Sequence, residues 1–154
     1  MDNPLISNED LAYIAGFIDG EGCVTLAKQV QNIRGVEYVV YYPLLNIANN
    51  YKPALDWVKE TVGYGSVCKK SRDARTNRVQ GWYYSAQYAK ATAVLKLVRP
   101  YLKIKGKQAD IAIEFQETKG IRDSKFQGSV PVEIMAIRMG LVAQIRLLNK
   151  RGLV

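Results

Sequence analysis

The fold is decided by the stretch Leu11-Ala12-Tyr13-Ile14-Ala15-Gly16-Phe17-Ile18-Asp19-Gly20-Glu21-Gly22. Its large apolar side chains recur at i, i+3, i+4 and i+7, which is typical of a helix that faces a protein core. A second stripe contains only small residues at intervals of four, namely Ala12, Gly16 and Gly20. A helix with two apolar faces is either buried on all sides in its own domain or packed against a copy of itself across a two-fold axis.

Two carboxylates, Asp19 and Glu21, stand at the C-terminal end of this predicted helix. That end carries about half a negative charge from unpaired carbonyl groups, so anions are mildly disfavoured there. Hard divalent cations such as Mg²⁺ bind carboxylate, carbonyl and water oxygens. The pattern therefore indicates that a positive group, most simply a divalent metal ion, joins the two acids.

Composition narrows the function classes. The 154 residues favour one domain over residues 1–154, and a net charge of +8 favours a polyanionic partner. The absence of histidine excludes Ser-His-Asp and Cys-His catalysis and every zinc site that needs histidine. The two cysteines, Cys23 and Cys68, are too far apart for a CxxC pair. No apolar run reaches the ~20 residues of a membrane span, so we expect a soluble, intracellular protein.

Periodicity and turn residues predict helices near residues 10–22, 52–62, 89–99, 108–119 and 131–149, and strands near 23–31, 36–48, 66–70 and 80–86. Ser7 or Asn8 is expected to cap the first helix. The expected class is α+β, in the order αββαββα with extra C-terminal helices, and the antiparallel sheet has one covered and one free face. In the first strand Val24, Leu26 and Val30 share one side, although Lys28 falls there as well.

The motif Ile14–Gly22 resembles the LAGLIDADG motif of homing endonucleases, matching it at Ala15, Gly16, Ile18, Asp19 and Gly22. Residues 62–67 resemble the helix-to-strand turn of this family, and residues 100–108 are similar to its basic loop, so the likeness covers about residues 10–118. A single motif implies an intron-encoded homodimer whose saddle-shaped sheets bind a long, pseudo-palindromic double-stranded DNA site. It also implies Mg²⁺-dependent double-strand cleavage that leaves short 3′ overhangs.

The resemblance also implies roles for residues of the motif and of the basic loop. Glu21 and the Gly20 carbonyl bind Mg²⁺, with two or more ions per dimer at the protomer interface. Asp19 holds the helix end, and the dimer interface contains Ala12, Gly16, Asp19 and Gly20. Lys105 stabilises charge or activates water, or else only contacts the DNA backbone.

A polar residue after the second strand is expected to position water. Asn49 is the first choice, with Asn50 or Lys52 as alternatives. The arginine that the family often places shortly afterwards has no clear match.

DNA contacts are expected from one face of the sheet and from the basic loops. The predicted contacts are Thr25, Gln29, Gln31, Arg34, Asn46, Lys70, Arg72, Arg75, Arg78, Gln80, Lys103 and Lys107. Two other functions remain open at this stage, an RNA-binding intron maturase and a catalytically silent DNA-binding protein of the same fold. The expected compartment is the cytoplasm of a prokaryote or an organelle.

Overall fold

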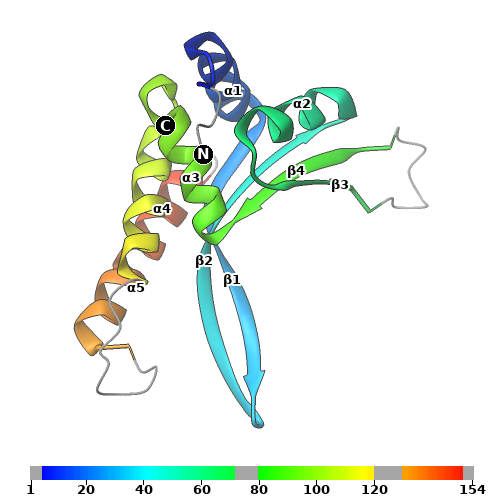
Figure 1. Cartoon of the computed structure of the whole chain (residues 1–154). Coiled ribbons are helices and arrows are strands. Elements are labelled where there is room, and N and C mark those ends of the chain that lie inside the picture. The colour runs from blue at the N-terminus through cyan, green and yellow to red at the C-terminus, as the bar shows by residue number, and fades with distance from the viewer. Residues whose placement is uncertain (1–4, 72–79, 120–129, 151–154) are drawn as a thin grey trace.

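The computed structural model describes residues 5–71, 80–119 and 130–150. The elements follow the predicted order αββαββα and continue with further helices (Figure 1). They are α1 (Asn8–Glu21), β1 (Gly22–Ile33), β2 (Val36–Asn49), α2 (Lys52–Val62), β3 (Ser66–Lys69), β4 (Trp82–Gln87), α3 (Tyr88–Val98), the 3₁₀-helix η1 (Arg99–Tyr101), α4 (Gly106–Thr118) and α5 (Val132–Asn149). Within these described parts, no helix is long and apolar enough to cross a membrane.

The four strands form one antiparallel sheet in the order β1-β2-β4-β3. Strands β1 and β2 make a long hairpin that projects from the body of the molecule, away from α1 and α2 (Figure 1). A two-residue turn closes the hairpin, with Arg34 (φ 53°) and Gly35 (φ 80°) both left-handed. Turns of this hand match the natural twist of paired strands, and Gly35 adopts the conformation without strain.

The helices cover one face of the sheet. The predicted stripe of α1, namely Leu11, Ile14, Ala15 and Ile18, is buried with residues of β1, β2, β4, α2, α3 and α4 in the main core. A second cluster joins Leu26 of β1 to α4 and α5 through Ile111, Phe115, Leu141, Val142 and Ile145. The opposite face of the sheet is not part of either core cluster, as the alternation of apolar residues predicts.

Several predicted boundaries were wrong by one or two residues. Helix α1 begins at Asn8, two residues before the predicted start near Asp10. Its cap is Ser7, one of the two expected caps, and the Ser7 Oγ accepts a hydrogen bond from the Asp10 backbone N–H (3.1 Å). Strand β4 begins at Trp82 and not at Gln80, whose side-chain Nε2 donates to the Lys70 and Gly81 carbonyls (2.9 and 2.8 Å). The bounds of α2 agree with the prediction.

Candidate active site and nucleic-acid interface

Asp19 anchors the basic loop to the end of α1. Its carboxylate accepts hydrogen bonds from the backbone N–H groups of Lys103 (2.8 Å) and Lys105 (2.9 Å). Burial opposes ionisation, but these backbone donors outweigh it, so the pKa of the Asp19 carboxyl lies below its ordinary value. The carboxylate is therefore already satisfied within the chain, which suits the structural role expected for it.

Lys105 binds the end of the same helix. Its Nζ donates to the Asp19 backbone carbonyl at 2.6 Å and is only partly exposed. A cation at a helix C-terminus is favourable because it neutralises the partial charge of the last carbonyl groups. The ammonium group therefore lies beside a residue that is two positions before Glu21, while its predicted catalytic role stays a prediction.

Glu21 and Asn49, which are far apart in the sequence, meet where α1 and β2 end. The Asn49 Nδ2 donates to Glu21 Oε2 at 2.8 Å, and the Asn49 Oδ1 accepts from the Tyr51 backbone N–H at 2.8 Å. The second bond fixes the orientation of the amide, so its N–H points at the carboxylate. Of the other water-positioning candidates, Lys52 is engaged in an ion pair with Asp56 (2.7 Å).

A shallow hollow opens beside this hydrogen bond. Its lining combines a single carboxylate with a lysine, amides and an indole, from Glu21, Ala48, Asn49, Asn50, Lys70, Gly81 and Trp82. Trp82 lies opposite Asn49 in the pairing of β2 with β4, and the Lys52 and Lys69 ammonium groups lie over its ring at 5.2 and 5.6 Å. The sequence did not single out Trp82 for this position, because nothing in it shows which strand pairs with β2.

The donor set of the hollow fits Mg²⁺. The ion is usually held by one or two carboxylates, several waters and phosphate oxygens, and not by a cage of protein groups alone. Glu21 is exposed at the helix end and supplies one such carboxylate, with the Gly20 backbone carbonyl next to it in sequence. The described residues contain no cluster of three acidic or cysteine side chains that could hold a metal by themselves.

The small-residue stripe of α1 faces outward. Ala12, Gly16 and Gly20 are all exposed, and a Cβ atom built on Gly16 or Gly20 would meet nothing within 4 Å. The interpretation that α1 is buried on all sides within its own domain is therefore wrong, because only its larger apolar stripe packs on the core. A helix face of this kind leaves room for the close approach of another backbone.

The predicted DNA contacts fall in different places. Thr25, Gln29, Gln31 and Asn46 lie on the free face of the sheet by strand alternation and register, although only Thr25 and Asn46 have buried neighbours along their strands. Arg34 lies exposed at the hairpin tip, and Lys103 is exposed in the basic loop. Lys107, in contrast, lines a hollow between α4 and α5 with residues such as Asp110 and Gln144, on the helical layer. Arg72, Arg75 and Arg78 lie outside the described residues.

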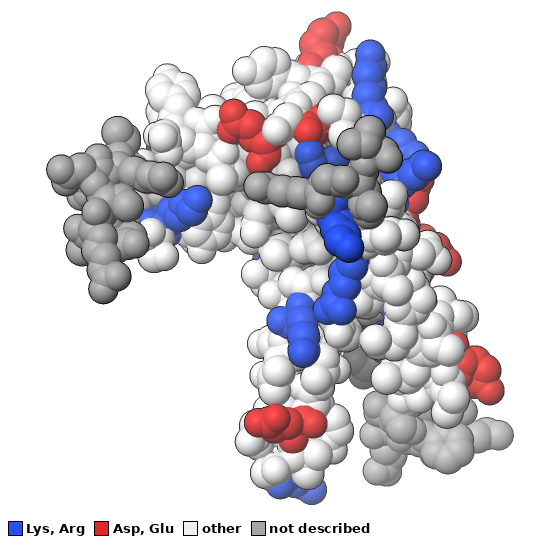
Figure 2. Space-filling model, turned by 180° about the vertical axis from the view of Figure 1, so that it is seen from behind, with Lys and Arg blue, Asp and Glu red and all other residues white. Residues whose placement is uncertain are grey.

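The charge distribution on one side of the molecule is shown in Figure 2. Lysine and arginine side chains follow one another down the middle of this view toward the hairpin, while most acidic side chains lie nearer the top or the edges. With the net charge of +8, such a row favours a polyanion that runs along the molecule.

The chain matches no protein-family model, and no curated protein matches it with significance. Solved structures do match. The homing endonuclease I-CvuI, in complex with the I-CreI target, superimposes with a TM-score of 0.69 at 17% identity, over 95% of this chain and 86% of that one. The archaeal intron-encoded homing endonuclease I-Vdi141I, complexed with DNA, gives 0.71 at 16% identity, over 94% and 87% of the two chains.

A longer protein matches over slightly less than half of its own length. The LAGLIDADG meganuclease I-AabMI, bound to uncleaved DNA, gives a TM-score of 0.60 at 19% identity, and the match covers 93% of this chain but 47% of that one. Together these likenesses show that the chain has the fold of the LAGLIDADG homing endonucleases, which confirms the predicted fold class.

Proposed function

We propose that this protein is a homodimeric, site-specific DNA endonuclease that cuts both strands with the help of Mg²⁺ and leaves short 3′ overhangs. The observation that carries the proposal is the Glu21–Asn49 hydrogen bond at the end of a helix whose small-residue face is exposed. A carboxylate held rigidly beside an outward-facing helix surface is suited to a site completed by a second copy and by DNA.

The match to longer proteins supports the proposed dimer, as does the exposed face of α1. This chain matches nearly the whole of I-CvuI but only about half of I-AabMI, so a single copy corresponds to one half of the longer protein. Two copies related by a two-fold axis through the Ala12, Gly16 and Gly20 stripe would bring the two Glu21 side chains toward each other. Two close carboxylates repel unless cations neutralise them, which agrees with metal ions at the protomer interface.

The residues around the hollow would have the following roles in the reaction. Glu21 and the Gly20 carbonyl would hold Mg²⁺, which as a Lewis acid supports phosphodiester hydrolysis. Asn49 fixes the Glu21 carboxylate in one orientation. Lys105, held on the Asp19 carbonyl, adds positive charge close to the helix end, and Lys70 adds another at the rim of the hollow. The phosphate attacked would lie over this hollow.

The test uses a pool of duplexes with a randomised insert, from which cut molecules are recovered in the presence of Mg²⁺. We expect Glu21→Gln to abolish cutting of the selected duplex while binding stays within several-fold of the wild type. Glu114→Gln, which changes an exposed carboxylate on α4, is the matched control and should cut like the wild type.

Three results would contradict parts of the proposal. If Glu21→Gln cuts like the parent, the metal assignment is wrong. Duplexes that are bound but never cut would leave a DNA-binding protein of the same fold, and preferential binding of structured RNA would favour the maturase function.

A further inference from the structure

Within the bounds of strands β1 to β4, the face of the sheet opposite the core carries no charged side chain among the described residues. Side chains alternate between the two faces of a strand, and the three strand pairings are continuous, so each side chain can be assigned to a face. The strands β1 to β4 contain three charged residues, Lys28, Glu37 and Lys69. All three share the side of the strand that holds core residues such as Leu26, Leu45 and Val67.

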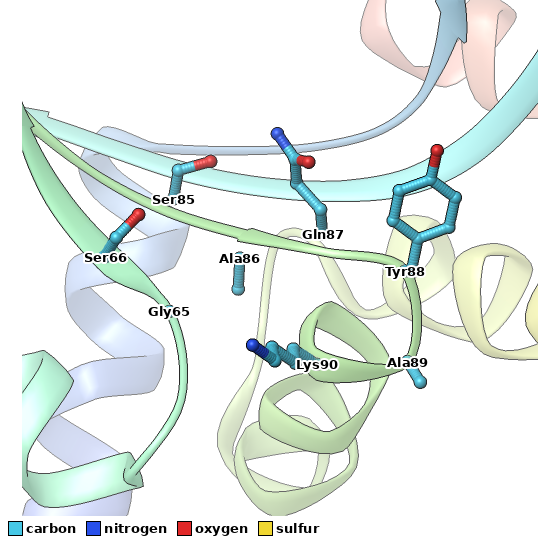
Figure 3. A pocket seen from close by; sticks show the side chains of 8 residues that line it. All are labelled: Gly65, Ser66, Ser85, Ala86, Gln87, Tyr88, Ala89 and Lys90. Atoms are coloured by element: carbon cyan, nitrogen blue, oxygen red, sulfur yellow. The ribbon is translucent and has the colours of Figure 1, made fainter.

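The chemistry of this uncharged face is amide, hydroxyl and methyl. One row across the strands contains Cys23, Asn46, Ser85 and Ser66. The next contains Thr25, Leu44 and Gln87, followed by Ala27 paired with Tyr42 and Gln29 paired with Val40. Figure 3 shows Ser66, Ser85 and Gln87 projecting to one side of their strands while Ala86 points to the other.

The side-chain amide of Gln29 on this face is already held in one orientation. The Tyr88 hydroxyl donates to Gln29 Oε1 at 3.2 Å, and its ring stacks on Tyr42 with the centroids 4.7 Å apart. Tyr88 adopts a left-handed backbone conformation (φ 56°), which a bulky residue rarely takes. These contacts hold the Gln29 amide at the surface before any ligand arrives.

We infer that the base pairs over the centre of this sheet, in each half of the DNA site, are A·T pairs. The inference rests on the proposed function, and it names the kind of base pair that the uncharged face of the sheet would contact. In the major groove, Arg and Lys are the most common readers of guanine, Asn and Gln pair with adenine, and apolar side chains contact the thymine methyl group. Gln29 supplies an amide that can pair with adenine, while Leu44 and Ala27 supply apolar contacts.

The charged groups would then act outside this centre. Arg34 lies beyond the end of the paired strands at the hairpin tip, and Lys70 follows β3 next to the hollow. Guanine readout by Arg34 or Lys70 would thus lie at the ends of each half-site. The middle of each half-site would be rich in A·T pairs.

The experiment is a binding selection with the wild-type protein, without Mg²⁺, from a pool of duplexes that carry a randomised insert. Each position of the selected site is then changed singly and tested by competition. The position that faces a given side chain is found from the variants Leu44→Arg and Gln29→Arg, each of which should shift the preference at one position toward guanine. The second variant replaces an exposed residue and so keeps the test valid if Leu44→Arg fails to fold.

We expect A·T pairs at the mapped positions, and a change to G·C should weaken wild-type binding by about tenfold, within the range of roughly 5- to 150-fold for one misread pair. Lys28→Ala, on the other side of β1, is the control and should leave every base preference unchanged. Wild-type selection of G·C at the mapped positions, with Mg²⁺-dependent cutting retained, would overturn this inference alone. A protein that enriches no duplex at all would overturn the proposed function with it.

Discussion

A methyl group added at Gly16 should stabilise the folded monomer and weaken the dimer. In this structure a Cβ on Gly16 meets no atom within 4 Å, and the residue lies inside α1. Glycine inside a helix costs about 0.5–1 kcal/mol relative to alanine, so Gly16→Ala should raise the free energy of unfolding of the monomer by about that amount. Across a close-packed two-fold interface the added methyl groups overpack, which typically costs about 1–3 kcal/mol.

The two effects have opposite signs and can be measured separately. Sedimentation equilibrium gives the dimer dissociation constant, which should rise by about tenfold or more, since about 1.4 kcal/mol corresponds to a factor of ten. Urea unfolding of dilute, monomeric protein gives the stability. Gly140→Ala is the matched control, because Gly140 also lies inside a helix, α5, with nothing within 4 Å of its Cβ position.

The control should gain the same stability and keep the wild-type dissociation constant. An unchanged dissociation constant for Gly16→Ala would refute the placement of the interface on this face of α1. A wild type that sediments as the 17.3 kDa monomer at every concentration would refute the dimer itself.

Three further predictions concern stability and binding. The pKa of Asp19 is lowered in the folded protein, so its carboxylate stabilises the fold above a pH of about 4 and loses that effect as the pH falls through the folded-state pKa. Asp19→Asn should therefore lower the free energy of unfolding by about 1–3 kcal/mol at pH 7. In urea titrations the difference from the wild type should shrink at pH 3. A Cβ atom on Gly65 (φ 92°) would lie 2.5 Å from the Tyr84 ring, whereas a Cβ atom on Gly63 (φ 78°) would meet open space. Gly65→Ala should therefore lower the thermal midpoint of unfolding clearly more than Gly63→Ala. Equal losses would show that the ring moves aside freely. Affinity for a labelled duplex, followed by fluorescence anisotropy, should fall by orders of magnitude between about 50 and 200 mM salt if several phosphates are contacted, and salt-insensitive binding would argue against a DNA-backbone interface.

Prediction from the sequence succeeded where the signal was local. The spacing of Leu11, Ile14 and Ile18 gave the buried face of α1, and Pro53 in the first turn and Gly63 after the last gave the bounds of α2. It was less accurate at helix and strand ends. The cap Ser7 was expected, but α1 starts two residues earlier than predicted, and the Gln80 side chain bonds to carbonyl groups just before β4 begins.

The candidate site was only partly accessible from the sequence. Position 49 was preferred because Leu45 and Ile47 set the phase of the strand, but two neighbours remained possible. Only the structure shows that Asn49 is the one bonded to Glu21, and that Lys105 turns back onto the Asp19 carbonyl. Both contacts join segments that are distant in the chain, and no periodicity encodes their distances.

Composition and local spacing were enough to give the net charge of +8, the lack of histidine, the order of helices and strands, and the motif that holds Glu21 at a helix end. These follow from composition and from spacings of a few residues, which act locally on the chain. Three other properties could be seen only in the folded chain. The Gly16 and Gly20 face of α1 is exposed, Trp82 adjoins the hollow, and strands β1 to β4 place no charged side chain on the free face of the sheet. Those properties depend on strand order and register, which are set by the packing of the whole core and not by any one segment.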